Sequence, residues 1–120
     1  MKYGVIIQYY LFSFWLETSD NINCNFLLDL AHMIISAHNF GMDVIDFVEK
    51  MGINRVYEVH VNLPQYKNEE WYAINEPFYY SDEAKRILEH IVEKKKAKVL
   101  NIECDREIIL QVNALIRGLR

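Results

Sequence analysis

The sequence contains few of the residues that mark secreted or repetitive proteins. Its 120 residues include two cysteines, two prolines and four glycines, and no internal repeat or low-complexity segment is evident. Two cysteines are too few for a disulfide framework, and the sequence shows no secretory signal pattern. We therefore expect Cys24 and Cys104 to be free thiols in a reducing, cytoplasmic compartment.

Excess positive charge and long apolar runs are also missing. The net charge is −4 and the pI is about 5.5, which leaves no electrostatic footprint for nucleic acid or an anionic membrane. One basic cluster, Lys94–Lys96 with Lys98, is expected to close a helix, where cations complement the helix dipole. The apolar segment Tyr3–Leu16 contains Gln8 and is shorter than a membrane span. We expect neither a nucleic-acid nor a membrane partner.

The composition that is present is that of an ordinary globular protein. Apolar residues make up 52% of the chain and charged residues 25%. Residues 1–120 fit a single domain, and a chain of this size buries roughly two-thirds of its unfolded surface.

The spacing of apolar residues predicts strands that alternate with helices. Strands are predicted at Gly4–Tyr10, Phe26–Asp29, Arg55–Asn62 and Lys98–Glu103. Helices are predicted at Phe14–Asp20, at Ala31–His38 with its end at Gly41, from the cap Asp43 to Gly52, after the cap Ser81, and after the cap Asp105. The fourth helix is expected to bury Ala84, Ile87, Leu88, Ile91 and Val92, and the last Ile108, Ile109, Val112, Leu115 and Ile116. The segment Leu63–Tyr80 shows no clear period and is predicted to be a long loop.

This order of elements predicts an α/β fold. Alternating strands and helices imply parallel pairing with right-handed crossovers. Four strands cannot close a barrel by themselves, so the parallel β-α units predict either an open parallel sheet or half of a TIM barrel.

Ionisable side chains stand where three of the predicted strands end. Asp29, His60 and Glu103 occupy these positions, and His32 can reach the same edge of the sheet. Ligand chemistry in parallel sheets gathers beyond the carboxyl ends of the strands, so we predict a shared metal site. A structural role stays open beside metal ligation, because Asp29 can simply cap the following helix and His60 can be a core histidine.

Other polar and aromatic residues are candidates for the wall of a pocket. Gln8 lies near the end of the first predicted strand, and Trp71 and Tyr72 belong to the long loop. The loop aromatics can equally cover a partner surface.

Several motifs, in this order, resemble a known family. They are Phe26–His32, Ser36–Asp43, Arg55–Val61 and Asn75–Pro77. The series is similar to the C-terminal half of the multinuclear non-haem iron-dependent oxidative enzymes, which are TIM barrels of the xylose-isomerase-like superfamily. The resemblance implies strand-end His, Asp and Glu residues that hold two or three iron ions, and an oxidative activity on cysteine-containing peptides.

The chain departs from that family at several ligand positions. Gln8 stands where the resemblance implies a glutamate, and Ala73 and Asn75 stand where it implies an aspartate and a histidine. Asn75 is also a candidate for the wall of a pocket. The matching positions left are Asp29, His32, His60 and Glu103, which can hold one iron, zinc or manganese ion. A multinuclear site is not expected.

Three hypotheses of function follow. The chain is a truncated, degenerate metal-binding barrel protein, a non-catalytic half barrel that acts as an oligomer, or a small-ligand-binding domain with a flavodoxin-like sheet; whether it is an enzyme stays open. A half barrel has two open strand edges and exposes an apolar inner face around Leu28, Val59 and Leu100 or their neighbours. We therefore expect a homodimer or larger homo-oligomer, or pairing with a separate N-terminal barrel half.

Overall fold

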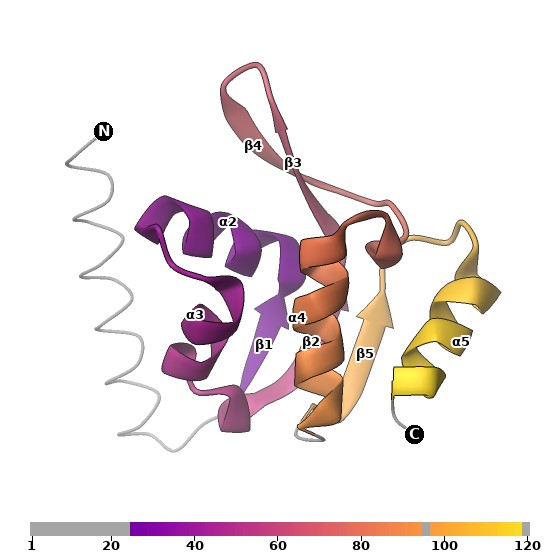
Figure 1. The fold of residues 1–120 in the computed structure, drawn as a ribbon. Helices are drawn as coiled ribbons and strands as arrows, with labels where there is room; N and C mark the ends of the chain where they lie inside the picture. The colour runs from indigo at the N-terminus through magenta and orange to yellow at the C-terminus, as the bar shows by residue number, and fades with distance from the viewer. Residues whose placement is uncertain (1–24, 95–96, 119–120) are drawn as a thin grey trace.

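The computed structural model describes residues 25–94 and 97–118 and shows strands covered on one side by helices (Figure 1). The elements in chain order are β1 (Phe26–Asp29), α2 (Leu30–Phe40), α3 (Val44–Met51), η1 (Ile53–Arg55), β2 (Val56–Val61), β3 (Leu63–Lys67), β4 (Glu70–Ile74), η2 (Phe78–Tyr80), α4 (Asp82–Glu93), β5 (Val99–Ile102) and α5 (Ile108–Gly118). The strand predicted at Gly4–Tyr10 and the helix predicted at Phe14–Asp20 lie outside the described residues.

Three parallel strands form the sheet in the order β1-β2-β5. Their residues line up in rows: Leu28 pairs with Val59 and Val59 with Leu100, whereas Asp29 pairs with His60. Because side chains alternate between the faces of a strand, neighbouring rows point to opposite faces of the sheet. The α/β class and the parallel pairing are confirmed, and the described strands form an open sheet rather than a closed barrel.

Helices α2 and α4 lie over one face of the sheet (Figure 1), which we call the covered face. Leu28 and Val59 are buried there at 3% and 0% exposure. The predicted helix caps are confirmed for Asp43, Ser81 and the left-handed Gly41 and Gly52. The predicted apolar stripe of α4 is also confirmed, since all its members are buried: Ala84, Ile87, Leu88, Ile91 and Val92. No helix among the described residues is long and apolar enough to cross a membrane.

The opposite face, which we call the open face, carries partly exposed side chains. Leu27 and Tyr57 are each 49% exposed and Val99 is 40% exposed. The expected exposed apolar face is therefore formed by the neighbours of Leu28, Val59 and Leu100, and those three residues belong to the core or pack against it.

The long loop predicted at Leu63–Tyr80 is wrong, because this segment contains a β-hairpin. Strands β3 and β4 pair antiparallel and project from the body of the protein (Figure 1). Their turn residues Asn68 and Glu69 both have positive φ, at 53° and 64°, which matches the twist that a two-residue hairpin requires. The hairpin shows no apolar period in the sequence because most of its side chains are exposed.

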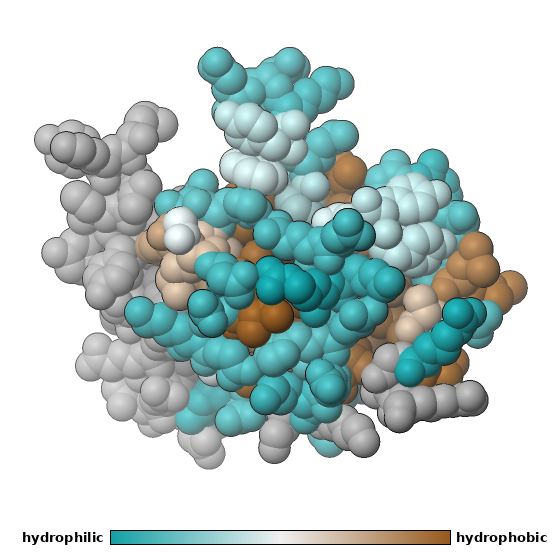
Figure 2. Space-filling model, in the orientation of Figure 1, coloured by the Kyte–Doolittle hydropathy of each residue, from teal (hydrophilic) through white to brown (hydrophobic). Residues whose placement is uncertain are grey.

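The predictions for the last helix are wrong in two respects. The helix begins at Ile108, and Glu107, whose carbonyl accepts the Gln111 amide, precedes it with φ 53°, so Asp105 is not the cap. Of the predicted buried side, only Leu115 is buried; the exposed members are Ile108, Ile109, Val112 and Ile116. Figure 2 shows the resulting apolar surface over α5. The stripe predicted for burial has no described element packed over most of it.

Candidate metal centre

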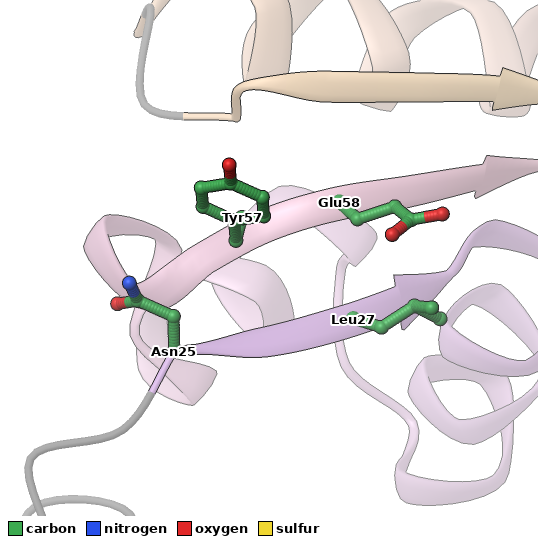
Figure 3. Close-up of a pocket in the computed structure, with 4 residues that line it drawn as sticks. All are labelled: Asn25, Leu27, Tyr57 and Glu58. Atoms are coloured by element: carbon green, nitrogen blue, oxygen red, sulfur yellow. The ribbon is translucent and has the colours of Figure 1, made fainter.

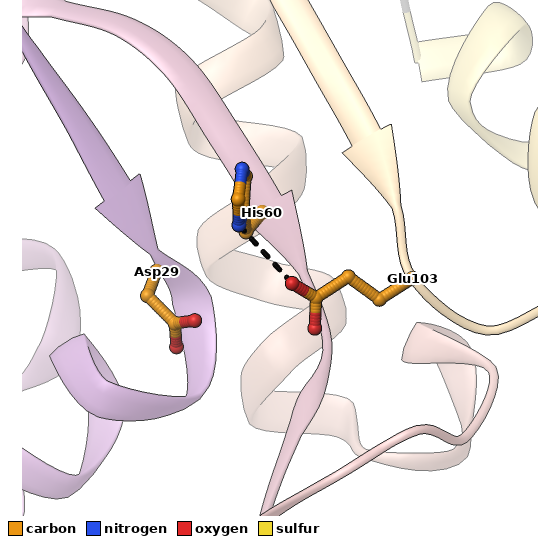
Figure 4. A group of neighbouring side chains, drawn as sticks. All are labelled: Asp29, His60 and Glu103. Atoms are coloured by element: carbon orange, nitrogen blue, oxygen red, sulfur yellow. Dashed lines mark ion pairs between the residues drawn. The ribbon is translucent and has the colours of Figure 1, made fainter.

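Three ionisable side chains gather at the carboxyl edge of the parallel sheet. Asp29 ends β1, His60 lies next to the end of β2, and Glu103 follows β5 directly. One possible ligand atom from each residue lies within 4.8 Å of the others. Figure 4 shows the three side chains around one space. The structure thus brings together three of the four residues that the sequence singled out as ligands, and we call them the rim triad.

The ring of His60 stands between two glutamates. Its Nδ1 lies 3.1 Å from Glu103 Oε1, and its Nε2 lies 3.0 Å from Glu58 Oε1. The Nδ1 atom therefore faces the rim triad and Nε2 faces away from it. An outer carboxylate that accepts the second ring N–H fixes the tautomer and orientation of a ligating histidine, and Glu58 is placed to do this.

A buried asparagine joins the two carboxylates of the rim triad. Asn62 is 3% exposed, and its Nδ2 donates to Asp29 Oδ2 at 3.1 Å and to Glu103 Oε2 at 3.0 Å. Its Oδ1 accepts the backbone N–H of Ala31 at 2.8 Å. The sequence prediction missed this residue, although its place directly after a buried strand was a usable signal.

Asp29 has two roles in the structure. Its Oδ1 accepts the backbone N–H of His32 at 3.0 Å, so the residue caps α2 as one of the two sequence readings expected. Its Oδ2 accepts from Asn62 within the rim triad. The cap and the cluster are compatible, because an ionised carboxylate has about four lone-pair sites.

His32 and the described pocket candidates are not members of the rim triad. His32 is exposed and is not a member of the group. Trp71 stacks on His38, with ring centroids 5.2 Å apart. The Tyr72 hydroxyl donates to Glu70 at 2.7 Å, and this hydrogen bond raises the pKa of the phenol. Asn75 is exposed, and Gln8 lies outside the described residues.

A shallow hollow of about 200 Å³ lies on the open face, near the start of the strands. It is lined by Asn25, Leu27, Tyr57 and Glu58, whose arrangement Figure 3 shows. Because Glu58 also contacts His60, the hollow is linked to the rim triad through one side chain. None of the pocket candidates that the structure describes, Trp71, Tyr72 and Asn75, lines it.

The donor set of the rim triad fits one divalent cation. Two carboxylates and a neutral imidazole offer oxygen and nitrogen ligands and a formal charge of −2, which a divalent ion neutralises. Imidazole with carboxylate suits iron, zinc or manganese. Three protein ligands leave positions for water or a substrate, as in catalytic rather than structural metal sites.

The described fold is of the α/β class, with parallel β-α units and a group of possible metal ligands at the carboxyl ends of the strands. The sequence model of one family, described as RiPP precursor modification enzyme MbnB/TglH/ChrH, matches residues 9–117. The chain belongs to this family, which comprises the multinuclear non-haem iron-dependent oxidative enzymes with a TIM-barrel-like fold, so the resemblance seen in the motifs is confirmed. The flavodoxin-like alternative is not favoured by this assignment. Neither the curated proteins nor the solved structures compared with the chain include a significant match.

Proposed function

We propose that the chain binds one divalent metal ion through Asp29, His60 and Glu103. The single observation that carries this proposal is the convergence of their ligand atoms within 4.8 Å at the carboxyl edge of the sheet. The family is iron-dependent, which makes iron the first ion to test, with zinc and manganese as alternatives. A bound ion of this kind supplies a Lewis-acidic centre, and iron adds redox chemistry.

The proposed site is degenerate relative to the family pattern. Ala73 and Asn75 stand where the motif resemblance implies further ligands, and both are exposed. Glu76, their neighbour, is paired with Arg106. We infer that the chain holds fewer ions than its relatives, and we expect no oxidative activity from the isolated chain. Elemental analysis that finds two or more irons per chain would contradict this reading.

Metal titration of two histidine variants tests the site. His60→Ala removes one of three ligands and is expected to abolish binding of Fe²⁺ or Mn²⁺ measured by calorimetry under anaerobic conditions. His90→Ala is the matched control, since His90 also lies against a glutamate, Glu49, at 2.7 Å but on the helical side of the molecule. Equal metal binding by both variants would remove the rim triad from consideration.

We also propose that the chain self-associates through α5. Ile109 is 72% exposed and Leu110 53% exposed on a helix that has apolar neighbours along its length. An apolar surface of this kind on a single helix is typical of an interaction site. β5 is an edge strand of the described sheet, so its open hydrogen-bonding groups support the same assembly.

Light scattering at micromolar concentration tests the assembly. We expect a dimer or larger homo-oligomer that Ile109→Glu converts to a monomer, because a charge cannot be buried unpaired in an apolar interface. Asn54→Glu places the same charge on another exposed position and serves as the control. If the wild-type chain is monomeric and forms a complex only with a protein that supplies further barrel strands, self-association is wrong. Pairing with a separate N-terminal barrel half then takes its place. A cytoplasmic location stays a prediction.

A further inference from the structure

We infer that Asn62 is a positioning residue that sets the two carboxylates of the rim triad at metal-binding distance before any metal arrives. The inference rests on the proposed metal site and adds to it a residue that is not itself a ligand. Asn62 sits directly after β2, in the rim between Val61 and Leu63, and all three are buried.

The hydrogen bonds fix which way the amide points. The oxygen side faces a backbone donor, the N–H of Ala31, and the nitrogen side faces two carboxylates. The reverse orientation would place the amide oxygen against two carboxylate oxygens and the NH₂ group against an N–H. Each amide hydrogen therefore serves one carboxylate. Asn62 thus places a neutral double donor between two anions that would otherwise repel each other.

The same side chain ties the site to the start of α2. The first amides of a helix lack partners inside the helix, and here Asn62 accepts from Ala31 while Asp29 accepts from His32. Asp29 is thereby held from both of its oxygens, one bonded to the helix and one to Asn62. Glu103 is held by Asn62 on Oε2 and faces His60 with Oε1. A preset geometry of this kind is the known contribution of groups that surround metal ligands.

Two substitutions separate positioning from simple helix capping. Asn62→Asp keeps an oxygen that can accept from Ala31 but replaces the double donor with a third acceptor that faces Asp29 and Glu103. Asn62→Ala removes both halves of the interaction. Ser81→Ala, which removes the cap bond to the Ala84 amide on the distant helix α4, is the control for lost stability alone.

The readouts are the thermal midpoint without metal and the affinity for Mn²⁺ by calorimetry. For Asn62→Asp we expect a lower midpoint in chelator-treated protein and a larger rise on adding Mn²⁺ than in the wild type, because the cation relieves the repulsion. For Asn62→Ala we expect Mn²⁺ affinity to fall about 10- to 100-fold. Ser81→Ala is expected to lower the midpoint while its Mn²⁺ affinity stays that of the wild type.

The outcomes distinguish this inference from the proposed function. If the wild type binds one ion and Asn62→Ala binds it equally well, the positioning role is wrong and the metal site stands. If Asn62→Asp matches the wild type without metal, Asn62 is only a helix cap and the inference is overturned. If the wild type binds no ion but Asn62→Asp is still destabilised without metal, the bridge between the carboxylates is supported and the proposed function fails.

Discussion

The two faces of the sheet differ in how deeply their side chains are buried, although both faces belong to the same short strands. On the covered face, Leu28 and Val59 are almost completely buried beneath helices. One residue away along each strand, Leu27 and His60 face the open side and remain partly exposed. The difference follows from the two-residue period of a strand, which sends neighbours to opposite faces. Residues that stabilise the core and residues of the candidate site are therefore neighbours in the sequence but lie on opposite faces of the sheet.

A pair of adjacent leucines gives the largest test of this comparison. Leu28→Ala leaves a cavity in the core and is expected to cost about 2–5 kcal/mol of unfolding free energy. Leu27→Ala is the same substitution on the open face, and we expect a cost below about 1 kcal/mol. Urea denaturation of both variants measures the two costs. Equal costs would mean that the open face is covered in solution.

The open face should respond in metal affinity rather than in stability. Glu58→Gln retains the shape of the side chain but removes the charge that faces Nε2 of His60. We expect metal affinity to fall about 10- to 100-fold, because a neutral amide is a weaker acceptor than a carboxylate and no longer raises the basicity of the ring. The unfolding free energy should change by less than about 0.5 kcal/mol at this partly exposed position. Calorimetric titration measures the metal affinity, and denaturation of the same preparation measures the stability. A variant that loses stability but keeps its metal affinity would contradict this prediction.

The smallest expected effect concerns the outer surface of the covering helices. The Asp43 carboxylate caps α3 and accepts from Arg86 of α4 at 2.8 Å, and this bond is the main cause of its lowered pKa. A carboxyl group with a lowered pKa stabilises the folded state fully above its unfolded pKa of about 3.9. That stabilisation is lost as the pH falls through the lower folded pKa.

Asp43→Asn isolates this charge, because asparagine is an equally good cap. The wild type should be slightly more stable than the variant near pH 6, and the difference should vanish in acid. Denaturation midpoints measured between about pH 3 and 7 give the profile, with ~3.9 as the reference pKa. A difference that is constant with pH would assign the effect to something other than the carboxylate.

The sequence predicts the rim triad because the positions of its three residues depend only on where the strands end. Asp29, His60 and Glu103 follow or end buried runs, and parallel strands bring such positions to one edge. Asn62 escaped prediction because its role depends on partners 33 and 41 residues away. Its place directly after a buried strand indicates a residue at the rim of the sheet, but its link between two carboxylates has no local sequence pattern.

Two other elements show where the sequence pattern is insufficient. The hairpin of β3 and β4 is mostly exposed, and its turn uses Asn68 and Glu69 instead of glycine. Helix α5 has the apolar spacing of a packed helix, yet spacing cannot tell whether the partner belongs to the same chain. Ile109 shows this most plainly, since its place in the stripe predicts burial and its exposure is 72%.

The parallel connection of the strands also has a kinetic consequence. The bonds from Asn62 to Asp29 and Glu103 close loops of 33 and 41 residues, so the rim triad exists only after distant parts of the chain have met. Non-local pairing of this kind slows folding, because the entropy of loop closure is lost before the contacts form. An ion specific for the rim triad therefore cannot nucleate the fold. It can only stabilise the folded state by binding to it, so added metal should slow unfolding while leaving the rate of refolding unchanged.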